Sequence, residues 1–141
     1  MPNQRRSFLK VLAATPLLAC SSNSGAPEQF PDVAAGNVAD VKVDTLSQVP
    51  GHPAVLGRDS QGLYAMTTTC THQSCPVTPE PGTPPTLYCS CHGSLFDSNG
   101  AVKAGPAPSP LVHFAVTVDA AGNITVKGTT QVAASVRTPV A

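Results

Sequence analysis

Short apolar runs separated by turn residues recur along this chain from residue 38 onward. The runs that predict strands are residues 38–46, 54–56, 63–66, 87–88, 101–103, 111–118 and 124–127. Turn signals separate them, such as Pro50-Gly51, the polar stretch 58–62 and the turn 119–123, which would join the last two runs into a hairpin. Residues 76–85 contain five prolines, which should deny that connection regular structure. Short strands, few charges and 15 prolines together predict an all-β domain.

The first 19 residues have a different pattern, in which basic residues precede a short apolar run. Residues 11–19 would rise only about 14 Å as a helix, whereas a bilayer core is about 30 Å thick. The segment, with Arg5-Arg6, resembles a twin-arginine export signal, and Leu17–Cys20 resembles a lipobox, whose cysteine is acylated after cleavage. We therefore predict a signal peptide over residues 1–19 and a lipid anchor at Cys20. A plain cleavage site that leaves a free thiol at Cys20 is the alternative.

Three further segments complete the predicted organisation of the chain. Residues 20–36 are rich in Ser, Pro, Gly and Ala and lack apolar periodicity, so we predict a flexible tether. Residues 37–128 are expected to form the single all-β domain. Residues 129–141 are expected to form a loose C-terminal tail.

Two short loops carry four of the five cysteines and two of the four histidines. They read Cys70-Thr-His72-Gln-Ser-Cys75 and Cys89-Ser-Cys91-His92-Gly-Ser94. Each loop can bring one thiolate and one imidazole to a metal. A tetrahedral zinc site could use two cysteines and two histidines, but the remaining two cysteines would have no role in it. A [2Fe-2S] centre in which His replaces Cys on one iron uses the same donors, and a pure disulfide framework is a third alternative.

Together the two loops resemble the cluster-binding boxes of the Rieske iron–sulfur family, Cys-x-His-x-x-Cys and Cys-x-Cys-His-Gly-Ser. The resemblance covers about residues 38–128 and is strongest over residues 70–108. It implies an antiparallel β-sandwich that holds one [2Fe-2S] cluster per subunit. It also implies the site residues, namely Cys70 and Cys89 as ligands of one iron, His72 and His92 as ligands of the other, and a Cys75–Cys91 disulfide. That disulfide is typical of the exported branch linked to quinol or cytochromes.

The resemblance also assigns residues around the cluster. Ser94 would donate a hydrogen bond to a bridging sulfide, and Gly105 and Pro106 would belong to a proline loop that covers one side of the cluster. Phe96 stands where high-potential members carry a tyrosine whose hydroxyl donates to a ligand sulfur, so we expect a lower potential here. Polar Gln73 stands where an apolar residue is usual at the docking tip, which disfavours quinol docking.

The charge distribution restricts the partners. From Cys20 onward the chain has five basic and eight acidic side chains, a net charge of −3, and no basic cluster. This argues against nucleic-acid binding and is compatible with a basic redox partner such as a c-type cytochrome. His52 and His113 have no cysteine nearby in the sequence, and we expect both to be structural or surface residues.

These observations predict a one-electron carrier. No set of residues suggests a nucleophile or a general base, so we do not expect the chain alone to be a complete enzyme. The first hypothesis is the electron-transfer subunit of a quinol:cytochrome c-type oxidoreductase, whose partners would be b-type or c-type cytochromes and quinol. The alternatives are a small relay subunit of an exported oxidase and a free-standing carrier or redox sensor. The signal and the anchor place the protein on the periplasmic face of a bacterial membrane.

Overall fold

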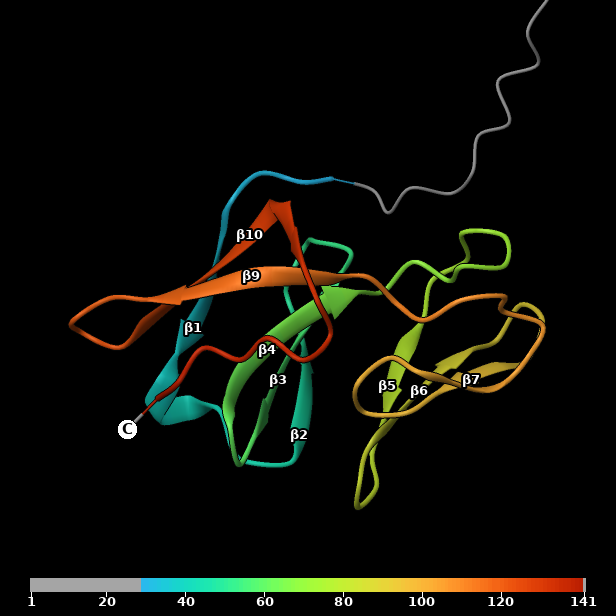
Figure 1. Cartoon of the computed structure of the whole chain (residues 1–141), viewed down its shortest axis with the longest axis horizontal. Coiled ribbons are helices and arrows are strands. Elements are labelled where there is room, and N and C mark those ends of the chain that lie inside the picture. The colour runs from blue at the N-terminus through green and yellow to red at the C-terminus, as the bar shows by residue number, and fades with distance from the viewer. Residues whose placement is uncertain (1–28, 141) are drawn as a thin grey trace, which may run out of the picture.

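In the computed structural model, which describes residues 29–140, the chain folds into ten β-strands and one short 3-10 turn (Figure 1). The elements are β1 (Val33–Asn37), η1 (Val38–Asp40), β2 (Thr45–Gln48), β3 (Ala54–Asp59), β4 (Gly62–Thr67), β5 (Thr78–Glu80), β6 (Thr86–Cys89), β7 (Ser94–Phe96), β8 (Val102–Ala104), β9 (His113–Val118) and β10 (Asn123–Val132). Every strand pairing is antiparallel, and residues 29–140 contain no α-helix, so the predicted all-β class is confirmed. Nor does this part of the chain include a helix that could span a membrane.

The larger sheet has six strands in the order β1-β10-β9-β4-β3-β2. Along β10 the buried side chains alternate with exposed ones, so that Ile124 and Val126 point into the core. The core of this sheet also includes Leu63 and Phe114, and the Phe114 ring meets the Phe30 ring edge-on with centroids 5.1 Å apart. This sheet forms the platform of the domain.

The smaller sheet has four strands in the order β5-β6-β7-β8, and it is inserted in the chain between β4 and β9 (Figure 1). Its apolar face includes Leu87 and Phe96, neither of which is exposed. These side chains belong to the same core cluster as Met66 of the larger sheet and the thiols of Cys70 and Cys89. The two sheets are therefore joined by a core that contains two of the predicted ligands.

The folded domain begins earlier than the sequence predicted. Phe30 is buried, and β1 pairs with β10, with Val33 opposite Val126. The predicted boundary of the tether at Gly36 is therefore wrong, because pairing with a distant strand gives residues 33–36 an extended structure that their own composition does not indicate. The predicted signal peptide, Cys20 and the start of the tether lie outside the described residues.

Two internal predictions also differ from the structure. The strand expected over residues 38–46 starts only at Thr45, because Asn37 caps a 3-10 turn by accepting a hydrogen bond from the Ala39 N–H at 3.1 Å. The proline-rich stretch 76–85 contains β5, which pairs with β6. β5 lies at the edge of its sheet, where a proline such as Pro79 is tolerated because one side of the strand needs no ladder hydrogen bonds.

The C-terminal segment is not the loose tail that we predicted. β10 continues to Val132, and the chain then returns so that Thr138 and Leu63 exchange backbone hydrogen bonds of 2.9 and 2.8 Å. The Thr138 hydroxyl also donates to the Val116 carbonyl at 2.6 Å. The segment therefore joins β4 to β9.

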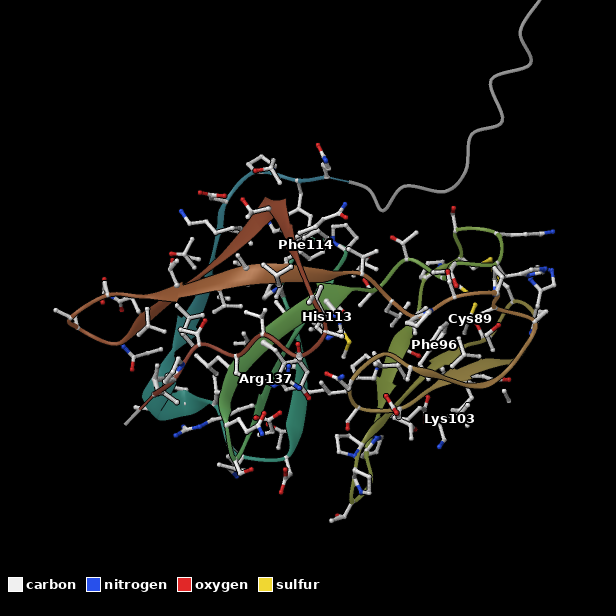
Figure 2. All side chains as sticks on the ribbon, in the orientation of Figure 1. Cys89, Phe96, Lys103, His113, Phe114 and Arg137 are labelled. Atoms are coloured by element: carbon white, nitrogen blue, oxygen red, sulfur yellow. A yellow bond between two sulfur atoms is a disulfide. The ribbon has the colours of Figure 1, made fainter. Side chains whose placement is uncertain are left out.

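Arg137 fastens the same segment to the rest of the domain (Figure 2). Its Nε donates to the Asp59 carboxylate at 2.6 Å, and another guanidinium nitrogen donates to the Asn99 side chain at 2.8 Å. The guanidinium carbon lies 4.1 Å from the centroid of the Tyr64 ring. One side chain thus contacts the β3–β4 turn, strand β4 and the turn after β7.

His113 is a buried residue of β9, as expected for a structural histidine (Figure 2). Its Nδ1 lies 3.3 Å from the Leu111 carbonyl, whereas Nε2 has no partner within residues 29–140, and its ring stacks on Tyr64. Burial lowers the pKa of His113; the Leu111 carbonyl raises this pKa, but the positive charge of Arg137 lowers it further. The other non-loop histidine, His52, is half-buried against Phe30.

The lowered pKa predicts how stability changes in acid. A histidine whose pKa is lower in the folded state contributes stability above its ordinary pKa of about 6.5, and this contribution is lost as the pH falls below it. We expect His113→Phe to lose less thermal stability than the wild type between about pH 7 and 5. Melting temperatures across this range measure the difference, and equal pH slopes in the two proteins would contradict the prediction.

Candidate metal centre

Three loops come together beside the smaller sheet, on the right of Figure 1. The first loop, residues 68–77, joins β4 to β5; the second, residues 90–93, joins β6 to β7; the third, residues 105–112, joins β8 to β9. A hydrogen bond of 2.7 Å from the Thr71 hydroxyl to the Ser109 carbonyl ties the first loop to the third. All the candidate site residues within the domain lie in these loops or in strands β6 and β7 beside them.

Backbone hydrogen bonds shape the first two loops. In the first, the Cys70 N–H donates to the Cys75 carbonyl at 2.8 Å and the Ser74 N–H donates to the Cys70 carbonyl at 2.9 Å. Ser74 has a φ of 58°, in the left-handed region that glycine usually occupies. In the second, the Gly93 N–H donates to the Cys89 carbonyl at 2.9 Å, and Gly93 has a φ of 79°. These turns direct the side chains of each loop towards the other.

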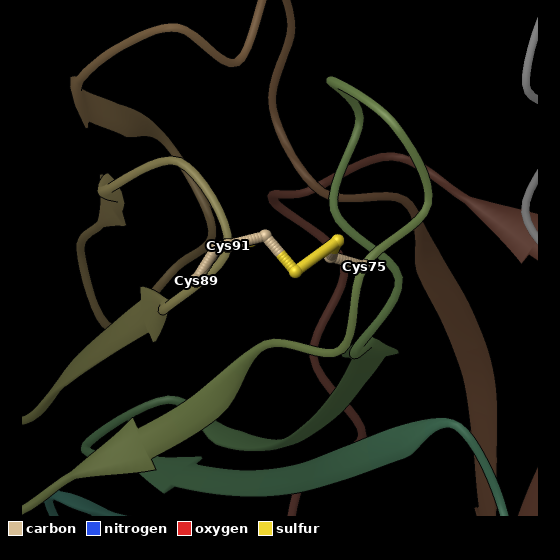
Figure 3. A group of neighbouring side chains, drawn as sticks. All are labelled: Cys75, Cys89 and Cys91. Carbon is tan, nitrogen blue, oxygen red and sulfur yellow. A yellow bond between two sulfur atoms is a disulfide. The ribbon is translucent and has the colours of Figure 1, made fainter.

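The predicted disulfide is present. Cys75 of the first loop is bonded to Cys91 of the second, with Cα atoms 6.4 Å apart (Figure 3). Cys75 is half-buried and Cys91 is exposed. The bridge holds the two loops at a fixed separation.

Cys70 and Cys89 are free thiols that are almost completely buried, with exposed fractions of 2% and 0%. Burial raises the pKa of the Cys89 thiol, and the adjacent Cys70 side chain raises it further, although backbone hydrogen bonds from Cys91 and His92 act in the opposite direction. The two sulfurs are therefore neighbours in a dry site, and backbone donors already point at one of them. Two such thiols are suited to bind a soft metal as thiolates.

His72 and His92 lie together at the same end of the domain. Their ring centroids are 4.7 Å apart and the ring planes meet at 85°. Nδ1 of His72 is buried and has no hydrogen-bond partner among the described residues. A buried polar atom without a partner is rare, since leaving it unpaired costs about 1–3 kcal/mol. This atom is therefore available as a metal ligand, and the two histidines fit the donor set of a cluster with two Cys and two His ligands.

The structure also places the residues predicted to surround the cluster. Ser94 is fully buried, and its hydroxyl oxygen accepts a hydrogen bond from the Ala107 N–H at 3.0 Å, which leaves the hydroxyl hydrogen free to donate. Phe96 is fully buried beside the two thiols, whereas Gly105 and Pro106 are exposed at the start of the third loop. The role of Ala107 was missed from the sequence, because an alanine that acts only through its backbone N–H leaves no motif.

The sequence matches the Rieske [2Fe-2S] domain over residues 31–119. The chain belongs to the Rieske family. Its relatives include the cytochrome b6-f complex iron-sulfur subunits of Synechococcus sp. (strain CC9605), 39% identical over 77 residues, and Synechococcus sp. (strain RCC307), 38% identical over 92 residues. These alignments cover 55% and 61% of this Rieske protein but 43% and 51% of the relatives, so the chain spans about half their length.

Solved structures give the same family and fold. The cyanobacterial plasma membrane Rieske protein PetC3 from Synechocystis PCC 6803 is 32% identical, with a TM-score of 0.54, over 67% of this chain and 98% of that one. The soluble domain of the Rieske protein II (soxF) from Sulfolobus acidocaldarius is 19% identical, with a TM-score of 0.51, over 69% of this chain and 77% of that one, and it shows the shared fold alone. The cofactor of this Rieske protein is a [2Fe-2S] cluster, as predicted.

Proposed function

We propose that Cys70, His72, Cys89 and His92 hold the cluster and that the protein carries one electron between redox partners. The observation that carries the ligand assignment is the buried, unpartnered Nδ1 of His72 in the loop beside the two buried thiols. A bound Rieske cluster supplies reversible one-electron reduction. The protein's own contribution is to keep the thiolate side dry while His92, which is exposed, brings the other side to the surface where a partner can dock.

The residues around the site suit this role. The Ser94 hydroxyl is positioned to donate to a cluster sulfur because the Ala107 N–H occupies its oxygen. The backbones of Cys91 and His92 act to lower the pKa of the Cys89 thiol, so they favour its thiolate form. Hydrogen bonds to cluster sulfurs favour the reduced state and raise the potential.

Metal analysis and spectroscopy of the purified full chain test the proposal. We expect iron and acid-labile sulfide in equal amounts and, after reduction, the electron paramagnetic resonance signal of a [2Fe-2S] cluster with mixed Cys and His ligands. Zinc in place of iron and sulfide would refute the proposal.

For the physiological role we propose electron transfer in a quinol:cytochrome c-type chain, because the relatives are named as cytochrome b6-f subunits. The three loops contain no charged side chain, so a partner would meet a polar and proline-rich surface that includes exposed Gln73. That surface is more polar than a quinol-docking surface requires. We therefore keep electron relay to an exported oxidase as the second candidate. Chemical cross-linking in native membranes distinguishes them: a b-type or c-type cytochrome supports the first role, and a catalytic oxidase subunit the second.

Export and lipid anchoring are a further part of this proposal, supported by the sequence of residues 5–20. We expect the mature protein to begin at an acylated Cys20 and to fractionate with membranes on the periplasmic side. Cys20→Ser should abolish incorporation of a fatty-acid probe and release the protein from membranes. A Cys20→Ser protein that remains membrane-bound would contradict the anchor.

Phe96→Tyr should raise the reduction potential of the cluster. The added hydroxyl can donate to a ligand sulfur, and one net hydrogen bond of about 0.5–1.5 kcal/mol corresponds to about 20–65 mV in a one-electron couple. A redox titration followed by visible circular dichroism measures the shift. Phe114→Tyr adds the same hydroxyl to the core of the larger sheet and should leave the potential unchanged. A Phe96→Tyr potential equal to that of the wild type would contradict this account.

A further inference from the structure

Three sulfur atoms lie close together where the first two loops meet. The Sγ atoms of Cys75, Cys89 and Cys91 are all within 4.8 Å of one another (Figure 3). They do not form a three-thiolate metal site, because two of them share the disulfide bond. A buried thiol beside a disulfide is instead the arrangement from which thiol–disulfide exchange proceeds.

We propose that Cys89 exchanges with the Cys75–Cys91 disulfide whenever it does not hold the cluster. This inference rests on the proposed function, in which Cys89 is a ligand. The Cys89 thiol gives up its proton as its sulfur attacks Sγ of Cys75. A Cys75–Cys89 bond forms as the Cys75–Cys91 bond breaks, and the displaced Cys91 thiolate takes up a proton. The chain keeps one disulfide and two thiols, so no oxidant or reductant is needed.

Sequence separation and exposure select Cys75 as the residue attacked. A bond between Cys89 and Cys91 would have to close over a single intervening residue, whereas a Cys75–Cys89 bond joins the two loops as the existing bridge does. Cys91 is exposed and Cys75 is half-buried, so Cys91 is the sulfur that water can stabilise as the departing thiolate. Cys70 lies outside this group of three sulfurs.

The exchange would control when the cluster can be bound. In the exchanged chain Cys89 is oxidised and cannot bind iron, so the ligand set is incomplete although the two loops are still bridged. Bound cluster prevents the exchange because it occupies the attacking sulfur. The exchanged chain must therefore return its disulfide to Cys75–Cys91 before Cys89 can bind the cluster.

The test begins with the loaded full chain. An iron chelator is added at about pH 9, above the ordinary thiol pKa of about 8.5, samples are alkylated at intervals, and peptide mapping identifies the bridged and the alkylated cysteines. We expect Cys75–Cys91 alone before chelation, then growth of Cys75–Cys89 with alkylated Cys91. Re-addition of iron and sulfide should restore the cluster slowly, since Cys91 must first attack Cys75 and release Cys89, and a small thiol that catalyses this reverse exchange should speed recovery. Chelated protein in which Cys75–Cys91 persists and only Cys70 and Cys89 are alkylated would overturn the proposal, and release of Cys75 would overturn the choice of the atom attacked.

Two matched variants separate this exchange from other reactions. Cys89→Ser should keep the Cys75–Cys91 bridge intact, whereas Cys70→Ser should still exchange. An unfolded chain would favour a Cys70–Cys75 bridge over a Cys75–Cys89 bridge, because Cys70 is closer to Cys75 in sequence and the loop to close is shorter; dominance of that product would refute exchange within the fold. Iron and sulfide analysis of the starting protein tests the proposed function separately, so the two failures are distinguishable.

Discussion

Cys89→Ser is expected to remove iron and acid-labile sulfide from the purified protein almost completely. The serine hydroxyl is not ionised at neutral pH and is a harder donor than a thiolate, so it is a poor ligand for an iron–sulfur cluster. Cys89 is fully buried, so water cannot reach its position to replace the thiolate. Iron and sulfide analysis and the visible absorption of the variant measure the loss.

Ser90→Ala is the matched control for this substitution. Ser90 is the next residue in the chain and is exposed, so the change alters the same turn without touching the buried thiols. We expect Ser90→Ala to retain the cluster. A Cys89→Ser protein that keeps normal iron and sulfide while folded would exclude Cys89 from the ligand set.

The candidate site was the part of this molecule best specified by local sequence. The donors and the disulfide cysteines occupy two short segments, and each segment forms a turn through its own backbone hydrogen bonds, such as that from the Ser74 N–H to the Cys70 carbonyl. The disulfide pairing was predicted only through the family resemblance, and the structure confirms it. The contact of Ala107 with Ser94 could not be predicted, because a backbone N–H has no sequence signature and the two residues are 13 positions apart.

The strands were predicted where the apolar pattern is strong and were missed where pairing with a distant strand decides the structure. β3, β4 and β9 have clear apolar runs and were expected. β1 has only one large apolar side chain, Val33, and exists because β10 pairs with it. The C-terminal segment appeared loose for the same reason, since its contacts are made by Arg137, by backbone groups of Thr138 and by the single apolar side chain of Val140 rather than by an apolar pattern.

Removal of the C-terminal segment is the second change with a large expected effect. Ending the chain after Ala134 is expected to lower the free energy of unfolding on the order of 6 kcal/mol, since it removes five hydrogen bonds to the rest of the domain, of about 1 kcal/mol each, and a cation–π contact of about 0.5–2 kcal/mol. A small domain has only about 5–15 kcal/mol in total. The expected fall in melting temperature is on the order of 25–45 °C. Thermal unfolding followed by circular dichroism measures it.

The pH dependence of the ion pair between Asp59 and Arg137 gives an independent check. Burial works to raise the pKa of Asp59, but hydrogen bonds and charge from Arg137, together with the Gln61 and Gly62 N–H groups, lower it overall. The ionised Asp59 therefore stabilises the fold above its ordinary pKa of about 3.9, and this contribution is lost as the pH falls through the lower folded value. Because the truncated chain lacks Arg137, its free energy of unfolding should change less in acid than that of the full chain.

Two variants identify which part of the segment is responsible. Val136→Ala changes an exposed side chain and should have little effect, whereas Arg137→Ala should reproduce a large share of the loss while leaving the Thr138 backbone bonds in place. Because neither change touches the cysteines or histidines of the three loops, iron content at low temperature should remain normal. A truncated protein as stable as the full chain would show that the contacts of Arg137 and Thr138 contribute nothing to the fold. A stable protein that lost its iron would instead show that Arg137, through Asn99 in the turn after β7, positions the metal centre.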